Sequence, residues 1–573
     1  MNYRQAYDKW LRDFSDDAAT IQELTAIAND ERAIEDRFYT GLEFGTAGMR
    51  GVLGAGLNRM NAYNVRRATA ALAEYILREP GQAARGVAIA YDSRRCSDSF
   101  AREAALTLCA RGVKAHLFDS LRPVPVLSFA VRRLNCVAGI VITASHNPPE
   151  YNGYKVYWED GGQIAPERAK EITSIIGTID YKDAVAMDER QALDKGLLSM
   201  IPAAVDDAYI DFVKSLCVNP ELAREMGKTV GIVYTPLHGS GNVPVRRVLR
   251  EIGFEQVHVV PEQEAPDPDF PTVRVPNPED PAVFDLALKL QEQLNADVVF
   301  GTDPDCDRVG VAVKDGAGQV HVLTGNQIGC LLLHYIVSQK AARGELPKDG
   351  AAVKSIVSTE MARAIAGRYG VTLFDVLTGF KFIAEMIQRF ETEHDHTFLF
   401  GFEESFGFLS GTEVRDKDGV NACMLIAETA AWYKKQGMTL YNALQALFAE
   451  YGHYGEQMTA FSLKGKDGLT RIGQIMRSLR SDPPTEFGPF KVIAVRDYQT
   501  GIRIEDGTLS HLGLPVSDVL YFELDKGAWV CVRPSGTEPK IRIYANVVTE
   551  SAEETQAQLE TLTKASVARL EAQ

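Results

Sequence analysis

The chain has 573 residues, 45% of them apolar and 24% charged, and a formal net charge of −16 at pH 7. This length is too great for one hydrophobic core and predicts roughly three to five domains, and the composition excludes disordered and fibrous proteins. The negative charge disfavours a nucleic-acid surface, although a few local cations and backbone amides can still hold a small anionic substrate.

Nothing in the sequence predicts export or membrane insertion. The first twenty residues scatter charged side chains where a secretory signal would have an apolar core, and no stretch approaches the ~18 apolar residues of a membrane span. The eight cysteines stand singly, without a CxxC pair or a histidine at zinc-site spacing, as in reduced cytosolic proteins. We therefore expect a cytoplasmic protein, either a monomer or a dimer, that binds neither membranes nor nucleic acids.

The predicted elements alternate between helices and short strands. The chain opens with polar-rich helix to about residue 40, and helical apolar spacing recurs from 62 until Pro80 ends it. Short β-branched runs then alternate with helical stretches, at 85–94, 113–119, 136–145, 229–237, 256–262, 296–303, 354–360, 371–377 and 396–405. This alternation predicts parallel or mixed sheets covered by helices, the α/β class.

Three of these runs end in polar, chemically capable residues, in the segments VAGIVITASHN, ADVVFGTDPDCD and HTFLFGFEES. In open α/β sheets, ligands gather at the carboxyl ends of strands. The segments therefore predict three comparable α/β domains that each give one loop to a shared cleft. Beyond about residue 455 the strand-rich pattern and a closing amphipathic helix predict a smaller α+β domain. The predicted domains are 1–226, 227–318, 319–454 and 455–573.

The acidic segment GTDPDCDRVG places Asp303, Asp305 and Asp307 at alternate positions after a buried strand. If the chain turns there, their carboxylates can converge on one hard cation. An EF-hand would need Gly and Glu where this chain has Arg308 and Lys314, which argues against that type of calcium site. Because unneutralised carboxylates beside an apolar strand repel one another, we favour a Mg²⁺ site over a solvated acidic turn.

Two further loops fit a phosphate and a sugar. In CVRPSGTEPKIRIY, Arg533 can fork onto a phosphate while 535–537 surround it with hydroxyls and backbone amides, although an ordinary turn fits equally well. In FGFEESFG, Glu403 and Ser405 stand two apart on an extended segment and can bind neighbouring sugar hydroxyls, with Lys417 in a charged turn beyond; a solvated strand end is the alternative. No Walker A or dinucleotide fingerprint occurs, so no nucleotide cofactor is expected.

The segment TASHNPPEYNGYK holds Ser145 at the abrupt end of an apolar run. On an extended segment Ser145 and His146 point in opposite directions, so they are not a serine-histidine dyad by themselves. The G-x-S-x-G elbow of serine hydrolases is also missing, and a purely structural Asn-Pro-Pro turn fits the segment as well. Taken together, the four loops favour transfer of a phosphoryl group on a sugar.

These loops resemble the motifs of the α-D-phosphohexomutases, and most closely the long phosphoglucomutase branch that also contains phosphopentomutases. The motifs occur in family order: EFGTAGMRG (43–51), YDSRRCS (91–97), TASHNP (143–148), DPDCDR (303–308), TGFK (378–381), FEESFG (402–407) and RPSGTEPKIR (533–542). The resemblance implies a four-domain enzyme around a central cleft, with three α/β domains and a smaller, mobile lid.

The resemblance also implies a role for each matching residue. Ser145 would be the phosphoserine and would hold one Mg²⁺ together with the three aspartates. Lys155 would be the general acid/base, with Arg50 and His146 nearby, and it could act as a base only if burial and neighbouring cations lower its pKa. Arg308 would neutralise phosphoryl oxygens. The residues expected to bind the sugar and the phosphate that is not transferred are Thr378, Gly379, Glu403, Ser405, Lys417, Arg533, Ser535, Gly536, Thr537 and Arg542.

The expected reaction is interconversion of α-D-glucose 1-phosphate and D-glucose 6-phosphate through glucose 1,6-bisphosphate, which also serves as activator. The segment FEESFG resembles the glucose pattern more than the Met-Ser or Gln-Ser versions of mannose and glucosamine relatives, but Phe402 stands where many relatives have Gly. Phosphopentomutase and phosphomannomutase activities stay open, as does a Mg²⁺-dependent sugar-phosphate phosphatase. A silent sugar-phosphate sensor is disfavoured because the serine, the aspartates and the lysine are all present.

Overall fold

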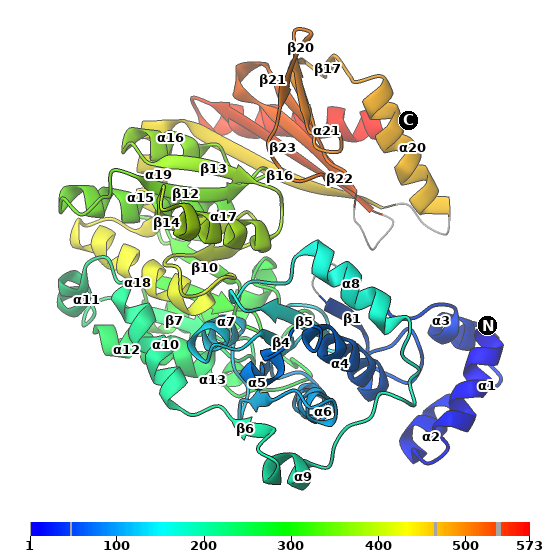
Figure 1. The fold of residues 1–573 in the computed structure, drawn as a ribbon. Helices are drawn as coiled ribbons and strands as arrows, with labels where there is room; N and C mark the ends of the chain where they lie inside the picture. The colour runs from blue at the N-terminus through cyan, green and yellow to red at the C-terminus, as the bar shows by residue number, and fades with distance from the viewer. Residues whose placement is uncertain (1, 46–47, 463–466, 535–539, 573) are drawn as a thin grey trace.

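The computed structural model describes residues 2–45, 48–462, 467–534 and 540–572. Three α/β units follow one another along the chain, and a fourth, strand-rich unit packs against the third (Figure 1). The predicted α/β class with a smaller C-terminal α+β unit is confirmed. At the N-terminus, three helices pack around a small aromatic core, as the polar-rich opening predicted: α1 (Tyr3–Asp13), α2 (Ala18–Ala26) and α3 (Glu31–Phe38).

The first unit is a six-stranded sheet with the order β1-β5-β4-β2-β3-β6. Its strands are β1 (Gly48–Val52), β2 (Val87–Tyr91), β3 (Ala115–Leu117), β4 (Ala138–Ile142), β5 (Tyr151–Trp158) and β6 (Leu198–Met200). Its helices are α4 (Ala62–Ile76), α5 (Gln82–Arg85), α6 (Ser97–Ala110), α7 (Val124–Arg133), α8 (Pro166–Ile176) and α9 (Glu189–Asp194). Alternate residues of β2 enter different cores, so helices cover both faces: Val87 and Ile89 join the core of α4 and α6, Ala88 and Ala90 that of α7.

The second unit has the strand order β11-β10-β9-β7-β8. Its strands are β7 (Ile232–Thr235), β8 (Val257–Val259), β9 (Val298–Thr302), β10 (Val309–Lys314) and β11 (Val320–Leu323). The helices along this stretch are α10 (Ala204–Ser215), α11 (Pro220–Met226), α12 (Asn242–Ile252), α13 (Pro261–Glu264), the 3-10 helix η1 (Pro281–Phe284) and α14 (Asp285–Leu294). The domain boundaries stay predictions, and the second sheet itself continues through β11 to Leu323.

The third unit has the strand order β13-β12-β14-β15. Its strands are β12 (Gly350–Ser355), β13 (Thr372–Val376), β14 (Thr397–Glu403) and β15 (Gly407–Leu409). Its helices are α15 (Gly325–Ala342), α16 (Met361–Arg368), α17 (Phe380–Glu393), α18 (Gly419–Lys435) and α19 (Leu440–Tyr451). The strand predicted over 354–360 is wrong in its position: the strand runs over Gly350–Ser355, and the β-branched residues that follow form a turn.

The three units share one strand plan. In each, three parallel strands are joined by an antiparallel fourth, in the orders β3-β2-β4-β5, β8-β7-β9-β10 and β13-β12-β14-β15. The predicted repeat of comparable α/β units is therefore confirmed. Because β2, β7 and β12 run parallel to β4, β9 and β14, the segments that follow each pair lie at one edge of the sheet.

The C-terminal unit is an antiparallel sheet with the order β16-β23-β22-β21-β18-β19-β20, and β17 pairs with β18. Its strands are β16 (His453–Ser462), β17 (Glu486–Phe487), β18 (Phe490–Asp497), β19 (Ile502–Glu505), β20 (Thr508–His511), β21 (Leu520–Leu524), β22 (Trp529–Pro534) and β23 (Lys540–Thr549). Its helices are α20 (Asp467–Ser481), the short η2 (Asp525–Gly527) and α21 (Ala552–Glu571). The closing helix was predicted, whereas β16 and α20 were not.

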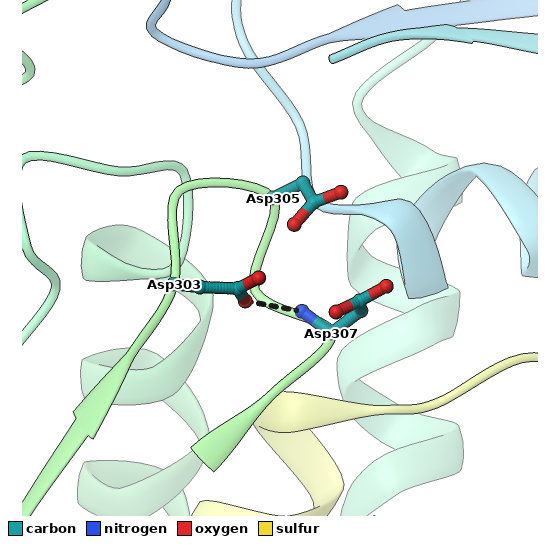
Figure 2. Close-up of side chains that lie close together, drawn as sticks. All are labelled: Asp303, Asp305 and Asp307. Atoms are coloured by element: carbon teal, nitrogen blue, oxygen red, sulfur yellow. Dashed lines mark hydrogen bonds between the residues drawn. The ribbon is translucent and has the colours of Figure 1, made fainter. Parts of the chain in front are cut away.

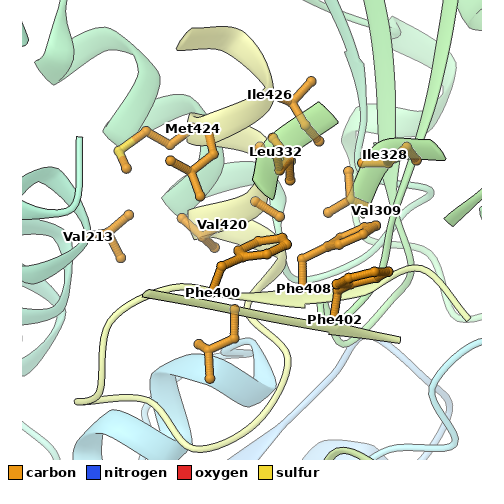
Figure 3. Close-up of a cluster of buried hydrophobic side chains, with 14 of the residues drawn as sticks. Val213, Val309, Ile328, Leu332, Phe400, Phe402, Phe408, Val420, Met424 and Ile426 are labelled. Atoms are coloured by element: carbon orange, nitrogen blue, oxygen red, sulfur yellow. The ribbon is translucent and has the colours of Figure 1, made fainter. Parts of the chain in front are cut away.

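One hydrophobic core joins the three α/β units. Figure 3 shows part of it, where Phe400, Phe402 and Phe408 of β14 and β15 lie in one cluster with Val420 and Met424 of α18. Helix α18 is almost wholly buried because small residues such as alanine recur along it and admit neighbours on every side. The strands that carry the candidate residues are thus fixed relative to one another by packing.

Candidate active site

The strands β4, β9 and β14 each run into a segment that holds candidate residues. Each segment contains one non-glycine residue with a left-handed backbone: Ser145 with φ 53°, Cys306 with φ 53° and Phe406 with φ 65°. Such conformations are rare for L-residues and persist where the surroundings hold them. The left-handed residues reverse the chain sharply between each strand and its antiparallel partner, which keeps the polar side chains at the sheet edge.

Ser145 faces the acidic segment of the second unit. Its Oγ donates a hydrogen bond to Oδ2 of Asp303 at 2.9 Å, and Nδ1 of His146 lies 3.3 Å from the same Oγ. The expectation that Ser145 and His146 point apart is therefore wrong, because it assumed an extended backbone at Ser145. Burial, followed by the positive charge of Arg308, lowers the pKa of His146 well below its ordinary value, so the ring is neutral.

The three aspartates converge as predicted (Figure 2). One carboxylate oxygen from each of Asp303, Asp305 and Asp307 lies within 4.8 Å of the others, and all three side chains are buried. The backbone N–H groups of Asp307 and Arg308 both donate to Oδ1 of Asp303 at 3.0 Å, which closes the turn. Burial, with repulsion from Asp305 and Asp307, raises the pKa of Asp303 well above its usual range.

This cluster fits a divalent cation. Within the described ranges, Oδ1 of Asp305 and Oδ1 of Asp307 are buried without a hydrogen-bond partner. Buried carboxylate oxygens left unpaired are costly, and a hard cation is the partner that several converging carboxylates suit. Asp303, Asp305 and Asp307 can therefore hold a metal ion.

Two lysines reach the same aspartates from different units. Nζ of Lys155, on β5, lies 2.9 Å from Oδ2 of Asp305, and Nζ of Lys417 lies 3.1 Å from Oδ2 of Asp307. Burial by itself would lower the pKa of Lys155, but Asp305 and Asp307 outweigh it and raise that pKa. The condition that burial and neighbouring cations lower the Lys155 pKa is therefore not met in this arrangement, because the nearest charged partners of the ammonium are carboxylates.

Two arginines lie around the serine and the aspartates. Arg50 is on β1, where its register partner is Gly153 of β5, and its Nη1 donates to Oδ1 of Asn147 at 3.1 Å. Arg308 forms an ion pair with Glu279. Glu279 was missed by the sequence reasoning, because it belongs to a loop far away in the sequence with no motif of its own.

The expected sugar-binding residues gather at the end of β14. Oε1 of Glu403 accepts a hydrogen bond from the backbone N–H of Gly379 at 2.6 Å, which ties the segment after β13 to the one after β14. Burial, with the neighbouring charge of Glu404, raises the pKa of Glu403 to about 7. Gly379 has φ 126°, a conformation open to glycine and strained for other residues.

A cavity of about 510 Å³ is lined by eight of the predicted site residues, whereas Ser145, Lys155 and the three aspartates are not among its lining residues. The predicted site residues that line it are His146, Arg308, Thr378, Gly379, Glu403, Ser405, Arg533 and Arg542. The last two are cross-strand neighbours on β22 and β23. Ser535, Gly536 and Thr537 lie outside the described residues. Further lining residues that the sequence did not single out include Glu456, Met458, Trp529 and Tyr544. The cavity thus has walls from the first three units and from the C-terminal sheet.

Comparison with known proteins agrees with this architecture. Sequence models of the phosphoglucomutase/phosphomannomutase family match the chain at residues 41–183 (α/β/α domain I), 207–316 (domain II), 324–451 (domain III) and 490–563 (C-terminal domain). The chain belongs to this family. The serine, aspartate and Glu403 segments fall in the family's domains I, II and III, one in each.

Relatives in the phosphoglucomutase/phosphomannomutase family cover nearly the whole chain. A phosphoglucomutase from Staphylococcus epidermidis is 36% identical over 515 residues, or 90% of this chain and 92% of its own. One from Staphylococcus haemolyticus is 35% identical over 552 residues, or 96% of this chain and 97% of its own. The open form of parafusin, a phosphoglucomutase from Paramecium, shares the fold with a TM-score of 0.68 at 16% identity, covering 93% of this chain and 95% of its own.

Membership of this family makes the chain an enzyme of the phosphohexomutase isomerase class. No described helix has both the length and the apolar character needed to cross a membrane.

Proposed function

We propose that this enzyme interconverts α-D-glucose 1-phosphate and D-glucose 6-phosphate by way of a phosphoserine at Ser145. The observation that carries the proposal is the single cavity that brings His146 and Arg308 together with Glu403 and with Arg533 of the C-terminal unit. Ser145 lies next to the His146 side of this cavity, 3.3 Å from the His146 ring and hydrogen-bonded to Asp303, and the other side offers arginines that suit a phosphate. The relatives named phosphoglucomutase support the choice of sugar.

The proposed first half-reaction moves the phosphoryl group from Ser145 to a sugar hydroxyl. The P–Oγ bond breaks as the new O–P bond forms, and one proton passes in net terms from the sugar hydroxyl to Oγ. We assign this proton transfer to Lys155. Its raised pKa favours the ammonium form, which can donate to the departing Oγ and then accept the hydroxyl proton, so the lysine ends as it began. Glucose 1,6-bisphosphate then turns around in the site, and the phosphate that the substrate brought is transferred to Ser145, which restores the phosphoserine.

The residues suited to one Mg²⁺ are Asp303, Asp305 and Asp307, with Ser145 as the fourth member. The ion supplies charge neutralisation for the phosphoryl oxygens. Arg308 lines the cavity and adds a fixed positive charge on that side. The Nζ of Lys417 pairs with both Asp307 and Asp416; we infer that it orients Asp307 rather than touching the sugar.

The opposite end of the cavity suits the phosphate that stays on the sugar. Arg533 and Arg542 line it from adjacent strands, and a phosphate held there would anchor the substrate in either of its two orientations. Glu403 and Ser405 line the same cavity, and their carboxylate and hydroxyl groups can bind sugar hydroxyls. The sugar is thus proposed to bridge the first and fourth units.

A parallel assay tests the proposal. Glucose, mannose and ribose 1-phosphates are supplied at equal concentration with Mg²⁺ and catalytic glucose 1,6-bisphosphate, and product and free phosphate are both measured. We expect the largest kcat/KM for glucose 1-phosphate and no accumulation of free phosphate. Equal turnover of ribose 1-phosphate would overturn the glucose assignment, and release of free phosphate without isomerisation would replace the mutase with a phosphatase.

A further inference from the structure

The segment after β2 contains a buried ion pair that the proposed mechanism leaves without a role. Asp92 is 2% exposed and Arg94 3% exposed, and Arg94 Nε lies 3.4 Å from Oδ2 of Asp92. The Arg94 guanidinium donates to four backbone carbonyls: those of Ser145 (2.6 Å), Asn147 and Pro148 (2.8 Å) between β4 and β5, and that of Tyr151 (3.1 Å) at the start of β5. The Arg94 side chain therefore holds together the whole segment that carries Ser145.

Asp92 holds the other side of the serine backbone through Thr143. The Thr143 hydroxyl donates to Oδ2 of Asp92 at 2.6 Å and accepts the N–H of Ser145 at 2.7 Å. A hydroxyl has one proton, so donation to the carboxylate leaves its lone pairs free to accept that N–H. The second oxygen of Asp92 accepts from Ser97 Oγ at 2.7 Å and from the Arg94 N–H at 3.0 Å. The backbone N–H of Ser145 is thus held by Thr143, and its backbone C=O is held by Arg94.

This fixation coincides with the left-handed backbone of Ser145, whose φ is 53°. A serine adopts that conformation only where its surroundings over-determine it. The conformation is what directs Oγ to Asp303 and brings the His146 ring within reach, since an extended backbone would turn the two side chains apart. Loss of the backbone hydrogen bonds would release the serine from this orientation.

The same arrangement, in which one strand-end segment hydrogen-bonds to the next, recurs in the other two units. After β7, the N–H and Oγ of Ser240 both donate to the carbonyl of Pro304 in the aspartate segment, at 2.8 Å each. At the end of β12, Ser355 Oγ donates to Oε2 of Glu404 at 2.9 Å, and just after the strand Ser358 Oγ accepts the N–H of Glu404 at 3.1 Å. In every unit, the segment after the central strand holds the segment after its neighbour. The shared strand order makes this a property of the repeat.

We propose that Thr143, Asp92 and Arg94 are positioning residues, which hold Ser145 in its left-handed conformation and so aim its hydroxyl for phosphoryl transfer. Thr143 and Arg94 bind the backbone of Ser145, and Asp92 binds Thr143 and Arg94 in turn, so all three act through the serine. The inference rests on the proposed function, because it concerns the orientation of the proposed phosphoryl carrier.

The test compares Thr143→Val with Thr143→Ser. Valine keeps the shape and removes the hydroxyl, whereas serine restores it. Thr429→Val is the matched control, because the buried Thr429 hydroxyl donates within its own helix, to the Leu425 carbonyl at 2.7 Å. Turnover, KM, melting temperature and the rate of Ser145 phosphorylation by glucose 1,6-bisphosphate are measured for each. We expect Thr143→Val to lower kcat by about ten- to a hundredfold with KM unchanged, and to slow phosphorylation in parallel.

We expect Thr143→Ser to recover most of kcat and Thr429→Val to leave it unchanged. Wild-type kcat in Thr143→Val, or an equal loss in Thr429→Val, would overturn the inference. Should Thr143→Val fail to fold, Arg94→Lys takes its place, because lysine keeps the positive charge but lacks the planar guanidinium that reaches several carbonyls. We then expect kcat to fall while the affinity for Mg²⁺ is unchanged. An unchanged kcat in Arg94→Lys would refute the inference. Absence of mutase turnover in the wild type refutes the proposed function instead.

Discussion

The two ends of the candidate site differ in how firmly their residues are held. At one end, the backbone of Ser145 is fixed by Arg94 and Thr143, and its side chain is fixed by Asp303. At the other end, Arg542 is exposed and Arg533 half-buried, and both stand on a sheet with a core of its own. That sheet contacts the third unit through a separate hydrophobic cluster around Ile356 and Tyr521. The first and second units, which carry Ser145 and the aspartates, instead share one continuous hydrophobic core.

This difference matches the demands of the proposed reaction. Phosphoryl transfer depends on positions accurate to a fraction of an ångström and on fixed charges around the moving group. Binding a distant phosphate needs only charge and donors within reach. Substitutions at the serine end should therefore lower kcat, and substitutions at the arginine end should raise KM.

The largest effect is expected from Ser145→Ala. It removes the proposed phosphoryl carrier while leaving the backbone hydrogen bonds in place, so the fold should persist and turnover should fall by about a thousandfold or more. Intact-mass measurement after treatment with glucose 1,6-bisphosphate should detect a phosphorylated species in the wild type and none in the variant. A variant that still becomes phosphorylated and active would place the carrier elsewhere.

Asp305→Asn tests the metal-binding half of the same end. The amide is isosteric with the carboxylate but removes one of the three converging charges, so we expect Mg²⁺ affinity to fall by about a hundredfold and activity at limiting Mg²⁺ to fall with it. Calorimetric titration with Mg²⁺ alone provides the measurement. Asp315→Asn, on the same unit but paired with His321, is the control and should bind Mg²⁺ as the wild type does. Equal affinities in the wild type and Asp305→Asn would argue against a metal site here.

Arg533→Ala tests the opposite end. Charge-assisted hydrogen bonds contribute about 1.5–3 kcal/mol, so KM for glucose 1-phosphate should rise by roughly ten- to a hundredfold with a smaller change in kcat. Arg503→Ala, whose side chain pairs with Glu523 on the same sheet, should leave KM unchanged. A loss confined to kcat would mean that the two ends are not functionally distinct.

Sequence patterns captured the residues that share a local segment. Asp303, Asp305 and Asp307 were predicted to converge because five residues and one turn suffice to bring them together, and the strand-end segments were predicted because apolar runs stop so abruptly there. Helix α20 was missed although its apolar residues are helically spaced, because the strands around it dominate the pattern of that region.

Relations across the sheet were not readable from the sequence. The role of Asp92 and Arg94 depends on β2 lying beside β4, and that strand order has no local sequence signal. The pairing of Lys155 with Asp305 likewise joins residues 150 positions apart, and it reversed the expected direction of the Lys155 pKa shift. The Ser145–His146 contact follows from a single positive φ at a residue type that rarely adopts one.

The smallest expected effect concerns Glu403, which lines the cavity. Burial, together with Glu404, raises its pKa to about 7 in the folded protein, whereas the unfolded chain should have the ordinary value near 4.3. Between these values the folded state binds more protons than the unfolded state, so the free energy of unfolding falls as pH rises from about 4.3 to 7, by about 1–3 kcal/mol. Glu403→Gln cannot ionise and should lack this fall. Denaturant unfolding of both proteins at pH 5 and pH 7.5 measures the difference. Parallel profiles would mean that Glu403 is already ionised at pH 5, and hence that its carboxylate is better solvated or better paired than its burial indicates.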